Sequence, residues 1–374
     1  MTSRTTVRTG LPSGLAAHGK ATPPGTSSRE SADGAHRVLA RCRDLVRPSL
    51  AAAIGRLHPW QGEMAAFSLG WCEVGGAPSD GSREGKGVRQ ALAVLCAEAA
   101  GAPPDSAVAA AVAVELVHTF SLLHDDIMDG DGTRRQRETV WKAYGTGPAV
   151  LAGDALLALA VQTLAEAPGP LTAVAVGRLS ETLSGLARGQ AEDLLLAARP
   201  WTGPGAVRTD EYRAMAELKT GTLLGCAAAL GGLLGGAPEP VVAALDRAGR
   251  HLGVAFQAVD DLLGIWGDPA VTGKPVHSDL RERKKTYPVL AALGRDDRRS
   301  AELAGILDSP VPLDEAGALR AAALVEACGG RDATLEEARH HLDAARVCLR
   351  SASLAPRAAG EIEVLLGFLL RRRM

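Results

Sequence analysis

The chain contains 374 residues, with 41 Lys or Arg against 43 Asp or Glu, so its net charge is −2. Charged residues make up 22% of the chain and aromatic residues only 3%. This balance provides no basic field for a phosphate backbone, which argues against a nucleic-acid partner. The six cysteines are scattered without Cys-x-x-Cys pairs, a pattern typical of free thiols in the cytoplasm rather than of disulfides or a zinc site.

Residues 1–34 are predicted to be a disordered N-terminal extension. They are rich in Thr, Ser, Gly, Pro and Arg, with no acidic residue before Glu30. Such a composition cannot bury enough apolar surface to offset the entropy of ordering the chain. An Arg-rich, acid-poor start is also typical of an organellar transit peptide, but Pro12, Pro23 and Pro24 interrupt the amphipathic helix that such a peptide needs.

Residues 35–374 are predicted to form one all-α domain. Apolar residues recur at helical spacing almost throughout, and glycine and proline clusters separate the periodic segments. The longest apolar runs, such as residues 223–234, are shorter than the ~20 residues that span a bilayer, so no membrane span is expected. The periodicity predicts helices over Arg41–Leu57, Trp60–Trp71, Val88–Ala100, Asp105–Asp129, Val150–Ala167, Leu171–Leu196, Asp210–Leu234, Pro240–Trp266 and Pro288–Leu293. Several more helices are expected between Leu293 and the C-terminus.

One of these expected helices ends in an acidic motif. Asp125, Asp126 and Asp129 follow an apolar segment that contains His118. Residues four apart lie on one helix face, about 5–6 Å from each other, so Asp125 and Asp129 can bind the same divalent ions. Asp126 is offset by about 100° around the helix. Oxygen ligands of this kind suit Mg²⁺, which often binds together with substrate phosphates.

Two arginines, Arg134 and Arg135, follow this motif after a Gly-rich turn. Guanidinium groups are fixed bidentate donors that match phosphate oxygens. Taken alone, such a motif is more often a helix end whose acids are solvated. The presence of a second acidic segment favours the metal-site interpretation.

The second acidic segment comprises residues 253–286. It contains Gln257, Asp260 and Asp261 on neighbouring helical turns, followed by a Gly/Pro loop with Lys274. Carboxylates that face one another without cations repel each other. We therefore expect the two acidic helices to line one cavity and to hold divalent ions between them, although two unrelated helix ends would show the same pattern.

From residue 36 to residue 374 the sequence resembles the trans-polyprenyl (isoprenyl) diphosphate synthases, in particular the farnesyl and geranylgeranyl diphosphate synthases. The motifs occur in the order typical of that family. They are the Gly85-Lys86-Gly87-Val88-Arg89 loop, His118, Asp125-Asp126-Ile127-Met128-Asp129 with Arg134-Arg135, Lys219-Thr220, Gln257, Asp260-Asp261 and Lys274.

The resemblance implies an isoprenoid synthase helical bundle around a central cavity, and a homodimer. It implies head-to-tail condensation of isopentenyl diphosphate with an allylic diphosphate (dimethylallyl, geranyl or farnesyl), assisted by about three Mg²⁺ ions. The implied metal ligands are Asp125, Asp126, Asp129, Asp260 and Asp261. The implied substrate-binding residues are Lys86, Arg89, His118, Arg134, Arg135, Lys219 and Lys274. The implied catalytic residues are Lys219, Thr220, Gln257 and Arg134.

The chain departs from the family pattern at several positions. Gly264 stands where many members have a third aspartate in the second motif, and Asp268 is the substitute expected from the sequence. Glu84 replaces a glycine, Gln90 stands where proline is common, and Glu138 replaces the proline after the arginine pair. We interpret these changes as tuning rather than loss of function, because the core ligands are kept.

Product length is expected to depend on Phe120 and Ser121. They precede Asp125 by five and four residues, which is about 6–7.5 Å along the helix. One large ring followed by a small hydroxyl, with no insertion in the first motif, resembles the pattern of geranylgeranyl (C20) synthases. A farnesyl (C15) product is the second expectation.

Three other functions share part of this pattern. A class I terpene cyclase shares the metal chemistry but has no use for Lys86, Arg89 and His118. A head-to-head condensing enzyme is expected to carry different acidic motifs. A non-catalytic subunit of a heteromeric prenyl synthase is expected to lose aspartates or arginines that this chain keeps.

Overall fold

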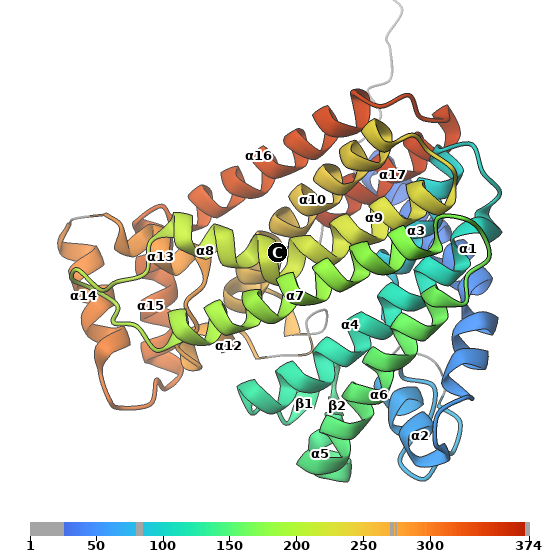
Figure 1. The fold of residues 1–374 in the computed structure, drawn as a ribbon. Helices are drawn as coiled ribbons and strands as arrows, with labels where there is room; N and C mark the ends of the chain where they lie inside the picture. The colour runs from blue at the N-terminus through green and yellow to red at the C-terminus, as the bar shows by residue number, and fades with distance from the viewer. Residues whose placement is uncertain (1–25, 80–84, 270–272, 274, 296, 371–374) are drawn as a thin grey trace, which may run out of the picture.

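The computed structural model describes residues 26–79, 85–269, 273, 275–295 and 297–370. They form a bundle of helices with one short β-hairpin (Figure 1). The predicted all-α fold is confirmed. The first half of the chain contains α1 (Thr26–Ile54), α2 (Pro59–Ser68), α3 (Val88–Ala99), the 3₁₀ turn η1 (Pro104–Ala107), α4 (Val108–Asp129), β1 (Thr133–Arg134), β2 (Arg137–Glu138), α5 (Val140–Tyr144), α6 (Thr146–Ala165) and α7 (Thr172–Ala197).

The second half is helical between its loops. It contains α8 (Thr209–Ala216), the π-helical turn η2 (Glu217–Gly221), α9 (Thr222–Leu234), α10 (Glu239–Trp266), α12 (Ser278–Arg281), α13 (Tyr287–Leu293), α14 (Arg298–Asp308), α15 (Glu315–Ala327), α16 (Gly330–Arg350) and α17 (Pro356–Leu370).

Helix α1 begins upstream of residue 35, where we predicted that the domain starts. Helix α1 already begins at Thr26, inside the segment that we expected to be disordered, whereas residues 1–25 lie outside the described part of the chain. Ala35, Leu39, Cys42 and Val46 are buried at helical spacing. This apolar stripe anchors α1 to the bundle, and the polar residues before it continue the same helix.

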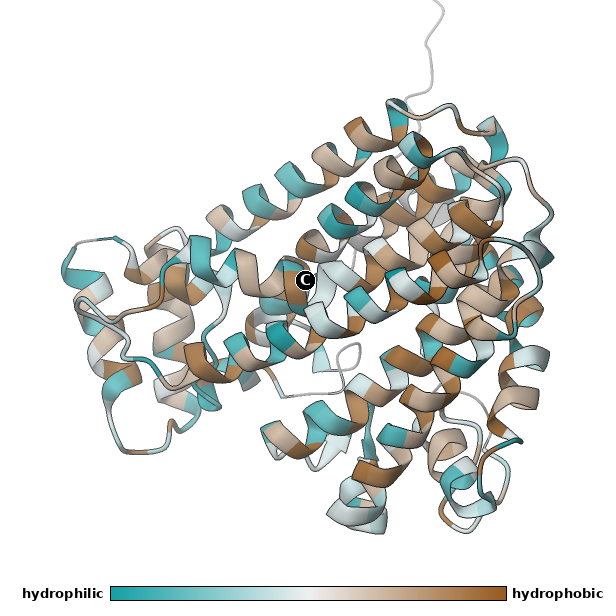
Figure 2. Cartoon of the chain, viewed as in Figure 1, coloured by the Kyte–Doolittle hydropathy of each residue, from teal (hydrophilic) through white to brown (hydrophobic). Residues whose placement is uncertain are grey.

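The long helices α4, α7, α9, α10 and α16 lie in layers across the molecule (Figure 1). Figure 2 shows apolar residues along α3, α9 and the first part of α4, and hydrophilic residues along α16. Helices α9 and α10 come very close, and a Cβ on Gly249 of α10 would lie 2.4 Å from the carbonyl oxygen of Leu224 on α9. Glycine is needed at this crossing, since any side chain would force the helices apart.

Two helices are long and apolar enough to cross a membrane by length and composition, contrary to the sequence-based expectation. They are Pro104–Asp129 and Thr146–Ala165, with 61% and 39% of their apolar windows buried inside the fold. The first is a core helix of the bundle that ends in the acidic motif. The second, α6, keeps an apolar face that the described chain does not cover, with Leu151 58% exposed.

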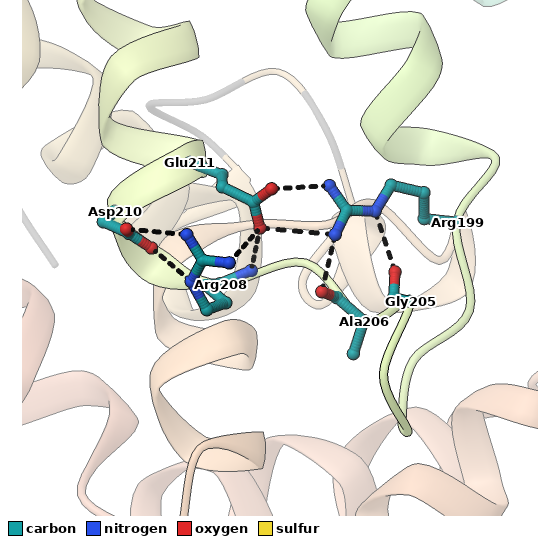
Figure 3. Close-up of polar contacts among 6 residues, drawn as sticks. All are labelled: Arg199, Gly205, Ala206, Arg208, Asp210 and Glu211. Carbon is teal, nitrogen blue, oxygen red and sulfur yellow. Dashed lines mark hydrogen bonds and ion pairs between the residues drawn. The ribbon is translucent and has the colours of Figure 1, made fainter.

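Helices α8 and α12–α15 gather at one end of the bundle, on the left in Figure 1. Their connection to α7 is braced by ion pairs (Figure 3). The guanidinium of Arg199 donates to the carboxylate of Glu211 (2.9 Å) and to the carbonyl oxygens of Gly205 and Ala206. The Glu211 carboxylate also accepts the backbone N–H of Arg208 (3.0 Å). These contacts fix the start of α8.

Candidate active site

The first acidic motif lies at the C-terminal end of α4, which stops at Gly130 in a left-handed conformation. Asp125 and Asp129 lie one helical turn apart, as expected. Asp126 instead is only 4% exposed, and one of its oxygens accepts hydrogen bonds from Nε (2.8 Å) and Nη2 (2.6 Å) of Arg134. In this structure Asp126 therefore anchors Arg134, and its role as a metal ligand stays a prediction.

The hairpin β1–β2 carries Arg134 and turns at Arg135 and Gln136. Thr133 pairs with Glu138 and Arg134 with Arg137, so the turn has two residues, both with positive φ (52° and 61°). Non-glycine residues at positive φ are strained and cluster at functional sites. Glu138, which replaces the family proline, is accommodated as an exposed residue of β2.

The π-helical turn η2 brings Lys219 to the acidic face of α4. The Nζ of Lys219 lies 2.6 Å from Oδ2 of Asp193 on α7. Burial raises the pKa of Asp125 to about 6, against the nearby charge of Lys219, while Asp129 adds repulsion. Burial lowers the pKa of Lys219, but Asp193 and Asp125 outweigh it, so its pKa is raised overall. Asp125, Asp129, Asp193 and Lys219 thus form one charged cluster.

The close approach of α7 to η2 depends on Gly189. A Cβ at this position would lie 2.5 Å from the backbone N of Lys219. A π turn shifts the hydrogen-bond register of a helix and is frequent at functional sites. The predicted continuous helix Asp210–Leu234 is therefore interrupted at the residues that carry the lysine–threonine pair.

In the second acidic motif, on α10, one aspartate is accessible and the other is buried, as in the first motif. Asp260 is partly exposed, but Asp261 is 3% exposed and surrounded by donors. Its Oδ2 accepts the hydroxyl of Tyr212 (2.7 Å) and the backbone N–H of Tyr287 (2.9 Å), and its Oδ1 accepts Nε2 of Gln257 (3.0 Å). Burial raises the pKa of Asp261 to about 7. These contacts direct the Asp261 carboxylate toward the protein interior, and metal binding by Asp261 stays a prediction.

A basic cluster lies around the N-terminus of α3. Nη1 of Arg89 is 3.1 Å from Nε2 of His118, and the pKa of His118 is lowered by burial and then by Arg89 and Arg135. A guanidinium only donates, so the neutral imidazole accepts at Nε2 and orients Arg89. The Arg135 guanidinium lies against Gly85, where a Cβ would be 3.0 Å from its Nη1. Lys86 Nζ lies 5.7 Å from the ring centroid of Phe368.

The arrangement provides two sites of complementary chemistry, one centred on Asp125 and Lys219 and one on Lys86, Arg89 and Arg135. In the described ranges, no three acidic, histidine or cysteine side chains converge on one point. The acidic face offers carboxylate oxygens, the ligand type that divalent cations such as Mg²⁺ and Ca²⁺ prefer.

The profile of the polyprenyl synthetase family matches residues 80–317 of this chain. A (2E,6E)-farnesyl diphosphate synthase from Mycobacterium bovis is 42% identical over 344 residues, covering 90% of this chain and 93% of the relative. A geranylgeranyl diphosphate synthase from Mycobacterium tuberculosis is 43% identical over 326 residues, covering 87% and 91%. The chain belongs to the polyprenyl synthetase family.

Solved structures agree with this assignment. A polyprenyl synthetase from Streptomyces coelicolor A3(2) has 45% identity and a TM-score of 0.84, covering 89% of this chain and 98% of that one. A polyprenyl synthase from Caulobacter crescentus CB15, solved with calcium and isoprenyl diphosphate, has 28% identity and a TM-score of 0.77, covering 92% and 98%. The isoprenoid synthase fold and the prediction of a short-chain trans-prenyltransferase are confirmed.

Within this prenyltransferase, sequence reasoning missed three acidic residues beside the predicted site. Asp193 forms an ion pair with Lys219. The sequence feature that could have indicated it is the polar pair Gln190 and Asp193, three residues apart and therefore on one face of α7. Glu115 lies one turn before His118, is buried, and is held at raised pKa by burial despite Arg89 and Arg135. Its apolar neighbours made it look like part of a core helix.

The third missed residue, Asp279, explains Gly264. A Cβ on Gly264 would lie 1.9 Å from Oδ2 of Asp279, so the Asp279 carboxylate from α12 fills the space that a side chain at 264 would need. Asp268, which we expected to substitute, is exposed beyond the end of α10. The second motif therefore gains its extra carboxylate from a later segment of the chain.

The last residues singled out in the sequence are Lys274, Glu84, Phe120 and Ser121. Lys274 and Glu84 lie outside the described residues. Phe120 is partly buried and packs edge-on against His124 (4.9 Å between ring centroids), whose ring lies against Gly153 of α6. The hydroxyl of Ser121 donates to the carbonyl of His118 (2.9 Å). Phe120 thus lies on α4 beside the ring that contacts α6, while Ser121 shares the helix face of Asp125 by its four-residue spacing.

Proposed function

We propose that this enzyme condenses isopentenyl diphosphate with an allylic diphosphate (dimethylallyl, geranyl or farnesyl) and releases geranylgeranyl diphosphate as its main product. The observation that carries the proposal is the pair of separate sites. The acidic face of α4 with Lys219 suits a metal-bound allylic diphosphate, whereas Lys86, Arg89 and Arg135 suit a second diphosphate bound directly by cations.

The cofactor of the allylic site is proposed to be Mg²⁺, about three ions per site, held by Asp125 and Asp129 on α4 and Asp260 on α10. The donor set fits, because Asp125 and Asp129 repel each other enough to help raise the pKa of Asp125, and a cation relieves that repulsion. Bound cations supply the positive charge that neutralises the departing diphosphate. The related enzyme solved with calcium and isoprenyl diphosphate supports a divalent site of this kind.

Side chains of the enzyme stabilise the positive charge that develops on the allylic carbon. Loss of the diphosphate leaves an allylic cation, toward which Thr220 and Gln257 present oxygen dipoles at the π turn. The Thr220 hydroxyl donates to Oε1 of Gln257 (2.9 Å), so the two side chains form one unit. Lys219, held by Asp193, is positioned to bind the leaving diphosphate.

Carbon–carbon bond formation then requires the second substrate to be oriented. C4 of isopentenyl diphosphate bonds to C1 of the allylic group, and a proton leaves C2 for an oxygen of the released diphosphate, so no protein base is needed. Arg89, oriented by His118, and Lys86 hold the second diphosphate. The apolar helices around the site keep water away from the cation.

A substitution in the basic cluster tests the assignment of the two sites. Lys86→Ala or Arg89→Ala removes a charge-assisted contact worth ~1.5–3 kcal/mol, so the KM for isopentenyl diphosphate should rise roughly 10- to 150-fold. The KM for the allylic diphosphate should change far less. Steady-state kinetics with radiolabelled isopentenyl diphosphate measures both constants. Equal changes in the two constants would reject the two-site assignment. Formation of a cyclic hydrocarbon without isopentenyl diphosphate would favour a cyclase.

The C20 product rests on Phe120 and Ser121. Two relatives of nearly equal identity are named as farnesyl and geranylgeranyl synthases, so overall similarity does not decide the length. If the Phe120 ring ends the channel beside α6, Phe120→Ala should lengthen the main product by at least one C5 unit, and Ser121→Phe should shorten it. Mass spectrometry of products from dimethylallyl and isopentenyl diphosphates decides this. An unchanged product from Phe120→Ala would place the floor elsewhere, and a wild-type product of C30 or longer would refute C20.

We further propose that the enzyme is a cytoplasmic homodimer that buries the uncovered face of α6. Val150 and Leu151 are exposed on this helix, and exposed Trp60 lies on α2, which packs against α6. Large apolar residues exposed on two neighbouring helices are typical of a protein–protein interface. All six cysteines are free, which suits a reducing compartment.

A further inference from the structure

Both carboxylate oxygens of Asp261 accept hydrogen bonds from protein donors. The Tyr212 hydroxyl and the Tyr287 backbone N–H both donate to Oδ2, and Nε2 of Gln257 donates to Oδ1. The side chain is 3% exposed and lies between α8, α10 and α13. A carboxylate with this surrounding cannot turn to a metal ion without leaving a backbone N–H unsatisfied in the interior.

Gln257 connects Asp261 to the catalytic pair. Its Nε2 faces Asp261, and its Oε1 accepts the hydroxyl of Thr220 at 2.9 Å. The two ends of an amide have nearly the same shape, so only the hydrogen-bond partners decide which end points where. An ionised carboxylate accepts and does not donate, so ionised Asp261 holds the nitrogen of Gln257 inward and its carbonyl oxygen toward Thr220.

We propose that Asp261 is a positioning residue that fixes the amide orientation of Gln257, so that a carbonyl dipole rather than an N–H dipole faces the allylic carbon. This inference rests on the proposed role of Gln257 and Thr220 at the allylic cation. A reversed amide would present a partial positive charge to a carbocation and would disfavour ionisation. Asp261 would thus act through Gln257 without touching substrate or metal.

The elements around Asp261 are built to resist reorganisation. The Tyr287 hydroxyl donates to Oε2 of Glu337 on α16 (3.0 Å), and Glu337 also forms an ion pair with Arg213, the neighbour of Tyr212. The start of α8 is braced by Arg199 and Glu211 (Figure 3). Both donors to Oδ2 of Asp261 are therefore held by contacts that do not involve the active site.

The Asp261→Asn variant tests the proposal, because it keeps the shape and replaces one acceptor oxygen by a donor. Tyr287 N–H requires the remaining oxygen, so the new amide nitrogen faces Gln257 and turns its carbonyl inward. We expect kcat to fall about 100-fold, as when a preorganised dipole is lost. The KM values and the Mg²⁺ activation constant should stay within about twofold. Asp260→Asn, in contrast, should raise the Mg²⁺ activation constant.

A compensating variant separates orientation from structural damage. In Asp261→Asn combined with Gln257→Glu, the new amide donates to the new carboxylate, whose other oxygen accepts from Thr220. The acceptor facing the cation is restored, so kcat of the double variant should exceed that of each single variant at least about tenfold. Circular dichroism and urea unfolding on all three variants separate changes in kcat from loss of fold.

Three results would overturn the inference. They are a normal kcat for Asp261→Asn, an increase of its Mg²⁺ activation constant like that of Asp260→Asn, and a double variant no better than the single ones. Failure of the proposed function would be visible separately, since the wild-type enzyme would then not condense isopentenyl diphosphate with any allylic diphosphate.

Discussion

The two Asp-Asp pairs, Asp125-Asp126 on α4 and Asp260-Asp261 on α10, look interchangeable in the sequence and differ in the structure. In each pair the first residue is on the accessible side and the second is buried, with 4% exposure for Asp126 and 3% for Asp261. Adjacent residues on a helix point about 100° apart, so one face cannot use both carboxylates. In this chain each paired aspartate motif therefore combines one accessible carboxylate with one internal anchor.

The anchors themselves are satisfied in different ways. Asp126 has a charged partner, Arg134, which approaches from the β-hairpin. Asp261 has three neutral donors from three helices. The first arrangement neutralises the buried charge and holds a hairpin arginine in place, whereas the second fixes the geometry of one amide. The following experiments probe this contrast, from the largest expected effect to the smallest.

The largest effect is expected from the accessible residue of the first pair. Asp125→Ala removes a carboxylate that the proposed ions need, so kcat/KM should fall roughly 1,000-fold or more while the fold persists. Prenyl transfer is measured with radiolabelled isopentenyl diphosphate, and circular dichroism checks the helices. The wild type in EDTA serves as the control and should be equally inactive. Near-normal turnover in either case would reject metal-assisted ionisation.

A smaller effect, on stability, is expected from the anchor of the first pair. Arg134→Gln leaves the Asp126 carboxylate buried without its charged partner, which should lower the free energy of unfolding by about 2 kcal/mol. Urea unfolding measures it. Asp126→Asn combined with Arg134→Gln replaces the ion pair by two amides and should recover at least half of the loss. A double variant as unstable as Arg134→Gln would show that the two side chains do not depend on each other.

The smallest effect concerns pH. Burial raises the pKa of Asp125 to about 6 in the folded protein, above its ordinary value near 4. The folded state therefore binds this proton more tightly than the unfolded state, and stability from this group is lost as pH rises between about 4 and 6. In EDTA, Asp125→Asn should gain about 1–2 kcal/mol over wild type at pH 7 and little below pH 4. Unfolding curves across that range test it, and a constant difference would contradict the raised pKa.

Much of the fold was predictable because its signals are local. Apolar spacing and Gly/Pro breakers placed α3 and α10 within one residue at each end, since these signals come from neighbouring residues. The start of α1 and the π turn at Lys219 were not predictable in this way. Residues 26–30 are polar, without an apolar stripe to signal a helix, and the π turn depends on Gly189 of α7 lying against the Lys219 backbone.

The candidate site also has features that local sequence predicts and features that depend on tertiary contacts. The sequence by itself determined that acids, arginines and a lysine–threonine pair occur in the order of one enzyme family, because chemistry and spacing are written along the chain. Only the tertiary structure decided that Asp126 and Asp261 turn inward, that Asp193 holds Lys219, and that Asp279 fills the space beside Gly264. These are contacts between segments far apart in sequence, and a helix pattern says which face a residue is on but not which partner meets it there.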